Sequence, residues 1–585
     1  MRGSARTSLV RPAARCPVPY ELTVFAHPTG LAVAAPGGAR LVPWSLVADL
    51  LSDPELVLHT MVMGDLSAWD SERLFLALAA GDAEALRLIA SFAWIPRTAV
   101  QSLPRYPKPW AGFIDLDVLV GDFSAACCRA GMVLPGSDPL VDVLLIENLL
   151  QRQRGQLAVR ARLQQDYPWL GEAAWLATTG QLAEQVVLQG LRRAQVWRSV
   201  PAGSCVVRTL VGADGLAAHR YQGLQSPEVR TAVAALWSST AHWDERGHLA
   251  VEGPAQQVFA IGGARIALGV GGLHSMDEPG IIEGPLIDLD VTSYYPSLIA
   301  RDGIAPPQVP EFAQRTHALL QRRLEAKRLG DGVASTALKY VINSLYGQLG
   351  NARSGLFSPA DALRVVLTGQ VHLLQLMDGI VSSGGEIISA NTDGIVVRTE
   401  NWSEVATAWE SITGLRLERT HYHRLWRTSV NDYVAVDQHG DLVKAKGRFG
   451  GGDEDDHVRR SAAPIIARAV IEFLIHQRPL AATINDAQDP ALFLLWRRAN
   501  GLHWCGHAID APVVRWMVAK NGTPLTQSTA QRVSSTVAAH AWIVIDPAQC
   551  SLHELDRGWY IHAAQDLVDQ VLGTYAGAKQ LTLFE

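Results

Sequence analysis

The chain has 585 residues, which is room for about two to four domains. Hydrophobic residues make up 48% and charged residues 18% of the chain, so a disordered or fibrous protein is excluded and a large globular core is expected. The formal net charge of −6 excludes an overall basic protein, although binding to phosphates needs only a local basic stripe.

The start of the chain, MRGSARTSLVRPAARCP, is basic and lacks an apolar stretch, so we expect a disordered lead-in and not a signal peptide. No apolar run approaches the roughly 18 to 20 residues of a membrane span, so no membrane partner is expected. The six cysteines form no CxxC pair, which indicates reduced thiols in a cytoplasm.

Residues 20–200 predict an α/β domain. Short apolar strands at Leu22–Phe25 and Leu31–Ala34 alternate with helical stretches at Ser71–Phe92 and Leu140–Leu163. The following segment, to residue 282, is rich in Gly, Ser and Pro and predicts irregular β structure. Beyond about residue 460, helical patterns such as SAAPIIARAVIEFLIHQ dominate.

A strand is predicted in GPLIDLDV, and it carries two acidic residues. Alternation along a strand places Asp288 and Asp290 on one face. Two carboxylates at the end of an apolar strand are costly unless water or a cation satisfies them. The turn Tyr294–Pro296 then leads into a short helix.

Two helices joined by the turn Leu329–Gly332 follow this strand. On the first helix, Arg323 and Lys327 are four residues apart and lie on one face. On the second helix, helical spacing places Lys339, Asn343 and Tyr346/Gly347 on one face. Basic residues on helices usually form a solvated face. Here three of them converge between two acidic strand motifs, which is the arrangement that a nucleoside triphosphate with its metal ions requires.

The second acidic motif is ISANTDGIVV, which predicts two short strands and a tight turn, because Asn, Asp and Gly tolerate left-handed backbone. Taken alone, Asp393 is a turn residue, since such turns are common. Its position after the other motifs makes it a candidate metal ligand.

In order and spacing these motifs resemble those of the family B DNA polymerases. DVTSYYPS resembles motif A, RLEAK the RxxxK of the fingers, KYVINSLYG motif B, NTDG motif C, and VKAKGRF the KxKG element that binds template and primer. The matches are dense over residues 283–450 and weak elsewhere.

The resemblance implies a DNA-directed DNA polymerase. Asp290 and Asp393 would be the catalytic residues and, with the Val291 carbonyl, would hold two Mg²⁺ ions, for which Mn²⁺ is a substitute. The dNTP would be bound by Ser293, Tyr295, Arg323, Lys327, Lys339, Asn343 and Tyr346, with Tyr295 stacking under the sugar and excluding a 2′-hydroxyl. Primer–template DNA would be bound by Gly347, Lys444 and Lys446; the alternative for the lysines is a solvated hairpin. No small-molecule cofactor is implied.

The expected fold class is multidomain α/β. An exonuclease-like (RNase H-like) α/β domain would precede a right-hand polymerase with an α+β palm, helical fingers and a mainly helical thumb. The expected boundaries are lead-in 1–19, exonuclease-like domain 20–200, β-rich connection 201–282, palm 283–310 and 351–460, fingers 311–350, thumb 461–575 and tail 576–585.

The chain departs from the motif C of the family at two positions. Asn391 replaces the first acid, and Gly394 replaces a serine. In the family the second acid, here Asp393, is the direct ligand. We therefore expect activity to survive with weaker metal affinity, and Asp288 is a candidate to restore the missing charge.

The N-terminal region occupies the position of a 3′–5′ exonuclease, which needs four carboxylates for two metals. Phe25 and His27 stand where its first acids belong, and an eroded second motif leaves Asp65. One carboxylate does not hold two metal ions, so we expect an exonuclease-like fold without proofreading. The short gaps between motifs also leave little room for inserted subdomains that enclose DNA, so built-in processivity is not expected.

The final residues, AKQLTLFE, resemble the QLxLF peptide with which bacterial polymerases bind the sliding clamp. Gln580 would be held by hydrogen bonds, and Leu581, Leu583 and Phe584 would fill an apolar pocket. This implies a clamp partner and a bacterial cytoplasm.

Two other functions stay open. A catalytically inactive, polymerase-like protein that binds DNA and the clamp is favoured by Asn391, but Asp290, Arg323 and Lys339 are retained. The second alternative function is that of a polymerase that accepts ribonucleotides or RNA templates. Tyr295 argues against the use of ribonucleotides.

Overall fold

The computed structural model describes residues 20–27, 30–35, 38–43, 46, 60–63, 71–90, 102–104, 112–115, 117–120, 123–135, 138–171, 173–189, 202–207, 210, 224–450, 463–509, 511–528 and 534–573. Within these residues the chain is a mixed α/β protein with several sheets. Asp65 and the four expected clamp-binding residues lie outside the described ranges.

The N-terminal part is built on a five-stranded mixed sheet of order β3-β2-β1-β4-β5. β1 pairs antiparallel with β2 and β2 with β3, whereas β1–β4 and β4–β5 are parallel. The strands are β1 (Tyr20–His27), β2 (Gly30–Ala35), β3 (Gly38–Val42), β4 (Thr60–Met63) and β5 (Gly112–Asp115). The expected α/β architecture is therefore present.

Two of the helices expected in this part are each divided in two. Gly81, in left-handed backbone at φ 72°, separates α2 (Ser71–Ala79) from α3 (Ala83–Ala90), and Gln153 separates α7 (Pro139–Arg152) from α8 (Arg154–Asp166). The other helices here are α5 (Asp117–Val120), α6 (Phe123–Arg129), the 3₁₀ helix η2 (Pro168–Leu170), α9 (Ala173–Leu176) and α10 (Thr179–Leu188).

The connecting region is rich in strands, as its composition predicts. Two antiparallel three-stranded sheets flank α14 (Pro227–Trp237), whose N-terminus is capped by Ser226. Gly262 and Gly263 both have positive φ, which suits the tight turn between β9 and β10. The strands are β6 (Gly203–Val206), β7 (Thr240–Trp243), β8 (Leu249–Glu252), β9 (Gln256–Ile261), β10 (Ala264–Gly269) and β11 (Gly272–Ser275).

A six-stranded antiparallel sheet of order β13-β14-β12-β15-β16-β17, which we call the central sheet, has more strands than any other sheet among the described residues. Its strands are β12 (Gly280–Val291), β13 (Glu386–Ala390), β14 (Gly394–Arg398), β15 (Leu417–Ser429), β16 (Asp432–Val436) and β17 (Leu442–Lys446). Along β12, Ile287, Leu289 and Val291 join the main core, whereas Leu286 joins a separate cluster on the other face. Asp288 and Asp290 therefore share the face of Leu286, as alternation predicts.

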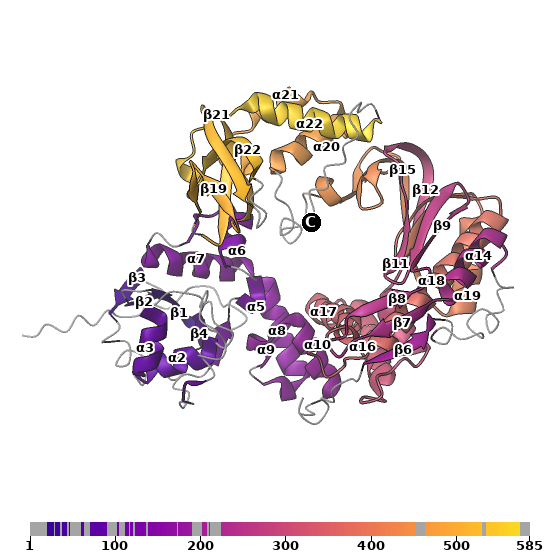
Figure 1. Ribbon diagram of the computed structural model, residues 1–585, viewed down its shortest axis with the longest axis horizontal. Helices are drawn as coiled ribbons and strands as arrows, with labels where there is room; N and C mark the ends of the chain where they lie inside the picture. Colours follow the sequence, from indigo (N-terminus) through magenta and orange to yellow (C-terminus); the bar gives the residue numbers. More distant parts are fainter. Residues whose placement is uncertain are drawn as a thin grey trace, which may run out of the picture.

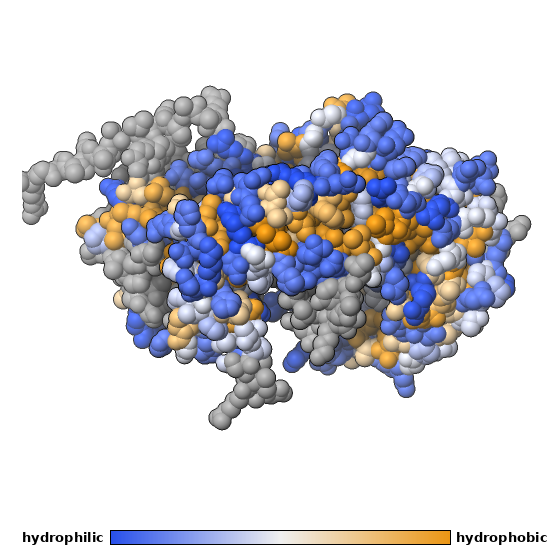
Figure 2. Space-filling view, turned by 90° about the horizontal axis from the view of Figure 1, so that it is seen from above, coloured by the Kyte–Doolittle hydropathy of each residue, from blue (hydrophilic) through white to orange (hydrophobic). Residues whose placement is uncertain are grey.

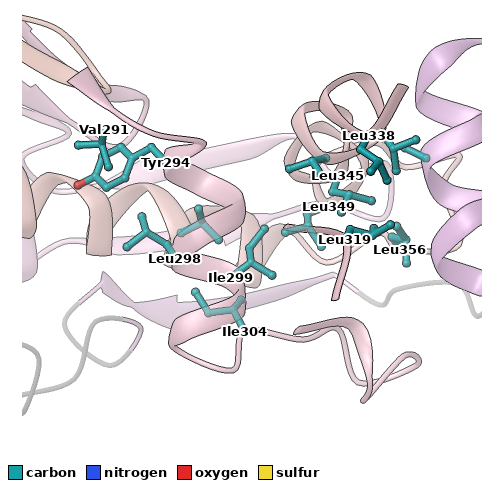
Figure 3. Packing of buried hydrophobic residues seen from close by; sticks show 14 of the residues in the cluster. Val291, Tyr294, Leu298, Ile299, Ile304, Leu319, Leu338, Leu345, Leu349 and Leu356 are labelled. Carbon is teal, nitrogen blue, oxygen red and sulfur yellow. The ribbon is translucent and has the colours of Figure 1, made fainter. Parts of the chain in front are cut away.

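Helices cover the core face of this sheet and connect it to a helical hairpin. They are α15 (Tyr294–Arg301), α18 (Pro359–Ser382) and α19 (Trp402–Thr413), and the hairpin is α16 (Phe312–Arg328) with α17 (Gly332–Leu349). Gly330 has φ 72°, and the Asp331 side chain caps α17 by accepting from the Ala334 N–H. Figure 3 shows Leu298 and Ile299 of α15 in one apolar layer with Leu345 and Leu349 of α17. This layer fixes the hairpin relative to the sheet.

α18 is 24 residues long and is the one helix among the described residues that is long and apolar enough to cross a membrane. In the sequence its apolar residues are interrupted by polar ones such as Gln370, His372 and Asp378, which hid this property. Of its most apolar window, 78% is buried inside the molecule, as in the core helix of a globular protein.

The C-terminal part corrects the expectation of a mainly helical thumb. Helices α20 (Pro464–His476), α21 (Leu480–Asp486) and α22 (Arg557–Val571) are accompanied by a sheet of β18 (Leu495–Arg498), β19 (Leu502–Trp504), β20 (His507–Ala508), β21 (Val513–Ser528) and β22 (Ser534–Ile543). The reason is the long β21–β22 hairpin, whose β-branched residues favour extended backbone. Short 3₁₀ helices complete the chain: η3 (Gly447–Phe449), η5 (Pro490–Phe493) and η6 (Pro547–Gln549).

In Figure 1, β19, β21 and β22 lie above α6 and α7 on one side of the molecule, and the central sheet lies on the other side. Seen from above, hydrophobic residues form a band across the outer face (Figure 2). Trp542 of β22 and Trp559 of α22 are among the apolar side chains that stay partly exposed in the C-terminal part.

Candidate active site

Two paired strands bring the acidic motifs together. Asp290 of β12 lies opposite Gly394 of β14, and the Val291 N–H donates to the Asp393 carbonyl at 2.8 Å. The Asn391 N–H donates to the Gly394 carbonyl at 2.9 Å, which closes the turn. A Cβ on Gly394 would lie 2.8 Å from the Leu289 carbonyl oxygen, so glycine is required by this close strand pairing. The predicted strand–turn–strand is confirmed.

Asp290 is half-buried beside two other carboxylates. Burial, followed by the negative charges of Asp393 and Asp288, raises the pKa of Asp290 to about 6, although Lys444 and Lys446 act in the opposite direction. Repulsion between neighbouring carboxylates is relieved by a bound cation, and carboxylate oxygens are the ligands that Mg²⁺ prefers. No group of three or more His, Cys, Asp or Glu that could hold a metal ion occurs in the described ranges.

A cavity of about 460 Å³ opens beside the two aspartates. Six of the seven residues that were expected to bind a nucleotide line it: Ser293, Tyr295, Arg323, Lys339, Asn343 and Tyr346. Lys327 does not line the cavity but lies exposed on α16, one helical turn beyond Arg323. Gly347 is exposed on α17 and also lies outside the cavity lining.

Arg323 has a donor available for a ligand. Its Nη1 donates to the Ser293 Oγ at 2.6 Å, whereas its Nε is buried without a hydrogen-bond partner. Burial lowers the pKa of the Arg323 guanidinium, and Glu418 opposes this change. A buried N–H without a partner costs free energy, so an anion entering the cavity would satisfy it.

Three tyrosines form the floor of the cavity. The Tyr295 ring lies 4.5 Å from the Tyr346 ring and 5.9 Å from that of Tyr294, centroid to centroid. The buried Tyr294 hydroxyl donates to the Gly369 carbonyl and anchors α15 to α18. Burial, Tyr346 and Asp393 raise the pKa of Tyr295, so its phenol stays neutral. The floor is therefore a rigid aromatic surface.

Asp288 has a different role from the one expected. It is buried, and its Oδ2 accepts from the Tyr422 hydroxyl at 2.6 Å and from the Lys444 Nζ at 3.0 Å. Burial acts to lower the pKa of Lys444, but Asp288 and Tyr433 outweigh it and the pKa is raised. The Asp288 charge is thus neutralised by Lys444. Lys446 lies 5.8 Å from the Tyr433 ring centroid.

Replacing Lys444 with methionine will lower the free energy of unfolding by roughly 2–4 kcal/mol, because Asp288 is left buried without its cation. Urea unfolding measures this. In a double-mutant cycle, adding Asp288→Asn to Lys444→Met should recover most of the loss. A double variant no more stable than Lys444→Met would show that the pair does not act as a unit.

Asn391 is held in a hydrogen-bond network. Its Oδ1 accepts from the Thr392 N–H at 2.9 Å and lies 3.0 Å from the His274 Nδ1, and its Nδ2 donates to Asn431 at 3.3 Å. His274 belongs to β11, which contacts β13 of the central sheet. Gly272 of the same strand lies against the turn, because a Cβ at this position would be only 2.8 Å from the Thr392 Cγ2. Asn391 therefore joins the turn between β13 and β14 to its neighbours.

Sequence reasoning missed Glu418 and His274. Glu418 of β15 lies opposite Asp290 and lines the same cavity as the two aspartates. Neither belongs to a recognisable motif, and their positions follow from strand pairing between distant segments.

The matches to curated proteins are DNA polymerases. No family model matches the chain. DNA polymerase II of Escherichia coli (strain K12) is 30% identical over 153 residues, which are 22% of this chain and 19% of that protein. DNA polymerase 2 of Saccharolobus solfataricus (strain ATCC 35092 / DSM 1617 / JCM 11322 / P2) is 24% identical over 244 residues, which are 37% of each chain. The matched regions thus span less than two-fifths of these relatives.

Among solved structures, the family B DNA polymerase from the hyperthermophilic archaeon Pyrobaculum calidifontis aligns over 97% of this chain and 78% of that chain, with a TM-score of 0.44 and 13% identity. Over part of its length, the chain is thus similar to proteins named as DNA polymerases.

Proposed function

We propose that the protein is a DNA-dependent DNA polymerase that extends a primer 3′ end with dNTPs. The observation that carries this proposal is one cavity in which Asp290 and Asp393 face Arg323, Lys339 and a tyrosine floor. Paired carboxylates beside free cationic groups suit a nucleoside triphosphate with its divalent cations.

Each residue has a distinct task in this proposal. Asp290 and Asp393, with the Val291 carbonyl, hold two Mg²⁺ ions, which when bound activate the primer 3′-hydroxyl and neutralise phosphate charge. Arg323 and Lys339 bind the triphosphate, with Lys327 at its outer end. Tyr295 lies under the sugar; Asn343 and Tyr346 contact the nascent base pair; Gly347, Lys444 and Lys446 contact the primer–template.

Primer extension on a short primed DNA template with Mg²⁺ and dNTPs tests the proposal. Wild type should extend the primer and Asp393→Ala should not. If neither protein extends the primer while both bind the DNA, the protein is the inactive, polymerase-like alternative and Asn391 is the first residue to restore.

Mg²⁺ binding is expected to weaken as the pH falls. The pKa of Asp290 is raised to about 6, so its ligand form is present above that pH and is lost below it. Between about pH 7.5 and about pH 5, proton competition should lower the affinity, approaching tenfold per pH unit below the pKa. Calorimetric titration with Mg²⁺ in the absence of DNA measures this affinity at each pH. An affinity that does not change with pH would contradict the assignment of Asp290 as a Mg²⁺ ligand.

Replacing Asn391 with aspartate should lower the Mg²⁺ concentration needed for half-maximal primer extension, by roughly 3- to 10-fold, because it adds a charge beside Asp290 and Asp393. Asn431→Asp, which adds the charge at the neighbour of Asn391, is the matched control. An unchanged Mg²⁺ dependence in Asn391→Asp would show that Asn391 does not weaken metal binding.

For the rest of the chain we propose an exonuclease-like N-terminal domain, a β-rich connection, palm, fingers and thumb within the boundaries given above. The β3-β2-β1-β4-β5 sheet supports the first of these. Phe25 and His27 fall on its strand β1, and the missing acids support a protein without proofreading. Metal-dependent degradation of a mispaired primer, abolished by Asp65→Ala, would refute this.

We also propose that the tail binds the bacterial sliding clamp, which places the protein in a bacterial cytoplasm. The QLTLF match supports it. Leu583→Ala with Phe584→Ala should abolish the retention of the protein on a clamp column, and undiminished retention would reject the proposal.

A further inference from the structure

A short segment of the connecting region lies along the strand that leads to Asp393. The segment consists of β11 and the two residues after it, residues 272–277, and we call it the strap. β11 contacts β13, which is an edge strand of the central sheet. The backbone groups on the outer side of an edge strand have no strand partner and need another one. Near the start of β13, the Ile387 N–H donates to the Gly262 carbonyl of the connecting region at 2.8 Å.

At the other end of β13 the strap supplies this partner. The Ser275 Oγ accepts from the Ala390 N–H at 2.9 Å and donates to the Ala390 carbonyl at 3.1 Å. Both residues are buried. Leaving a buried backbone group without a partner costs free energy, so the last residue of β13 is fixed against the strap.

A buried carboxylate of the strap holds the bulge that precedes the turn. The pairing of β13 with β14 shifts register between Ile387 and Ser389. The Ser389 Oγ donates to the Asp277 Oδ2 at 2.6 Å, and the Asp277 side chain is 3% exposed. Arg427 of β15 pairs with the same Asp277 oxygen at 2.9 Å and donates to the Ile388 carbonyl at 2.6 Å. A bulge redirects the residues that follow it, so these contacts determine how the strand enters the turn.

His274 is the residue of the strap that contacts the turn through its side chain. The Asn391 Oδ1 accepts from the Thr392 N–H at 2.9 Å, which orients the amide of Asn391. The His274 Nδ1 lies 3.0 Å from the same oxygen. An amide oxygen only accepts hydrogen bonds, so the His274 Nδ1 is the donor in this contact. His274 thus holds the residue two positions before Asp393.

The position of the Asp393 carboxylate depends on the backbone of this turn. The side chain of Asp393 is exposed, so packing does not fix it. On one side the turn is held by the Val291 N–H, which donates to the Asp393 carbonyl. On the other side it is held by the strap through Asn391. Groups outside the ligand set that orient a metal ligand contribute strongly to metal affinity.

We propose that the strap positions Asp393 for the metal ions, with His274 as the positioning residue that acts through Asn391. The proposal rests on the proposed function, because the ions are those of nucleotidyl transfer. It makes the connecting region a part of the active site. It also gives Asn391 a role that needs a hydrogen-bond acceptor and no charge.

Binding of Mn²⁺ alone, without DNA, tests the proposal. Mn²⁺ takes oxygen ligands as Mg²⁺ does, and electron paramagnetic resonance of the free ion measures its binding to the full chain. His274→Leu should weaken Mn²⁺ binding by roughly tenfold. His274→Asn should bind within about twofold of wild type, because its amide nitrogen replaces the imidazole Nδ1 as a donor.

His248→Leu is the matched control for this titration, because it removes an exposed histidine of the connecting region whose Nδ1 contacts Asp244. It should bind Mn²⁺ as wild type does. Equal Mn²⁺ affinities for His274→Leu and His248→Leu would overturn the proposal.

A double-mutant cycle tests whether His274 acts through Asn391. Asn391→Ala removes the acceptor, so adding His274→Leu to Asn391→Ala should cause no further loss of Mn²⁺ affinity. If the two losses multiplied instead, His274 would act by another route and the proposal would be wrong.

Hydrogen exchange gives a readout that needs no metal. The Thr392 N–H donates to the Asn391 Oδ1, and the Asn391 N–H donates to the Gly394 carbonyl. Both should exchange roughly tenfold faster in His274→Leu and at the wild-type rate in His274→Asn. Unchanged exchange in His274→Leu would overturn the proposal. A wild type that extends no primer would reject the proposed function alone, because the exchange rates still decide whether the strap holds the turn.

Discussion

Replacing Asp393 with asparagine will lower the rate of nucleotide incorporation by roughly 10³-fold, comparable to the loss of one preorganised electrostatic group from an active site. The folded state will not be weakened. Asp393 is exposed, and its negative charge raises the pKa of the half-buried Asp290. The substitution removes that repulsion, so the thermal midpoint should stay the same or rise.

The sign of the stability change depends on pH. The pKa of Asp290 in the folded protein is about 6, above its ordinary value of 3.8, so its contribution to stability is present at low pH and is lost as the pH rises from about 4 to about 6. Asp393→Asn lowers this pKa and restores part of the loss. The gain in thermal midpoint over wild type should therefore be seen above about pH 6 and disappear near pH 4.

A matched control separates the two effects. Asp437 is partly exposed in the β16–β17 turn, where backbone N–H groups of His439 and Asp441 donate to it and lower its pKa. Asp437→Asn should reduce the thermal midpoint slightly and leave incorporation unchanged. If Asp393→Asn instead retained activity and lost stability, Asp393 would be a turn residue and not a metal ligand.

The sequence predicted those parts of the site in which the position of a side chain is determined by the strand or helix that carries it. Asp288 and Asp290 share a face because strands alternate, and Lys339, Asn343 and Tyr346 share a face because helices repeat. Helical periodicity also placed Lys327 beside Arg323, but the nucleotide cavity ends before that turn of α16.

The parts that were missed depend on contacts between distant segments. Glu418 enters the site through the pairing of β12 with β15, and Asp288 is neutralised by Lys444 through the pairing that continues to β17. Arg515 of β21 donates to the carbonyl of Met132, which is 383 positions away in the chain. None of these has a periodic or motif signal, because a single sequence does not encode which strands will be neighbours.

Tyr295 gives the second large effect, on the choice of sugar. Its ring is fixed between Tyr346 and Tyr294 at centroid distances of 4.5 and 5.9 Å, on the floor of a cavity that also contains the two aspartates. In the proposed polymerase this ring occupies the space that a 2′-hydroxyl would need. Tyr295→Ala should therefore reduce the preference for dCTP over CTP, measured as the ratio of kcat/KM values, by roughly 10²- to 10³-fold.

Tyr295→Phe distinguishes the ring from its hydroxyl. The packing against Tyr346 is made by the ring, and the raised pKa of Tyr295 means that no charge is lost when the hydroxyl is removed. Tyr295→Phe should therefore keep the wild-type preference, while Tyr295→Ala gains CTP incorporation and keeps most of its dCTP incorporation. If both variants accepted CTP equally, the hydroxyl and not the ring would select the sugar. If neither did, the steric barrier would lie elsewhere on the cavity wall, with Asn343 the nearest polar alternative on α17.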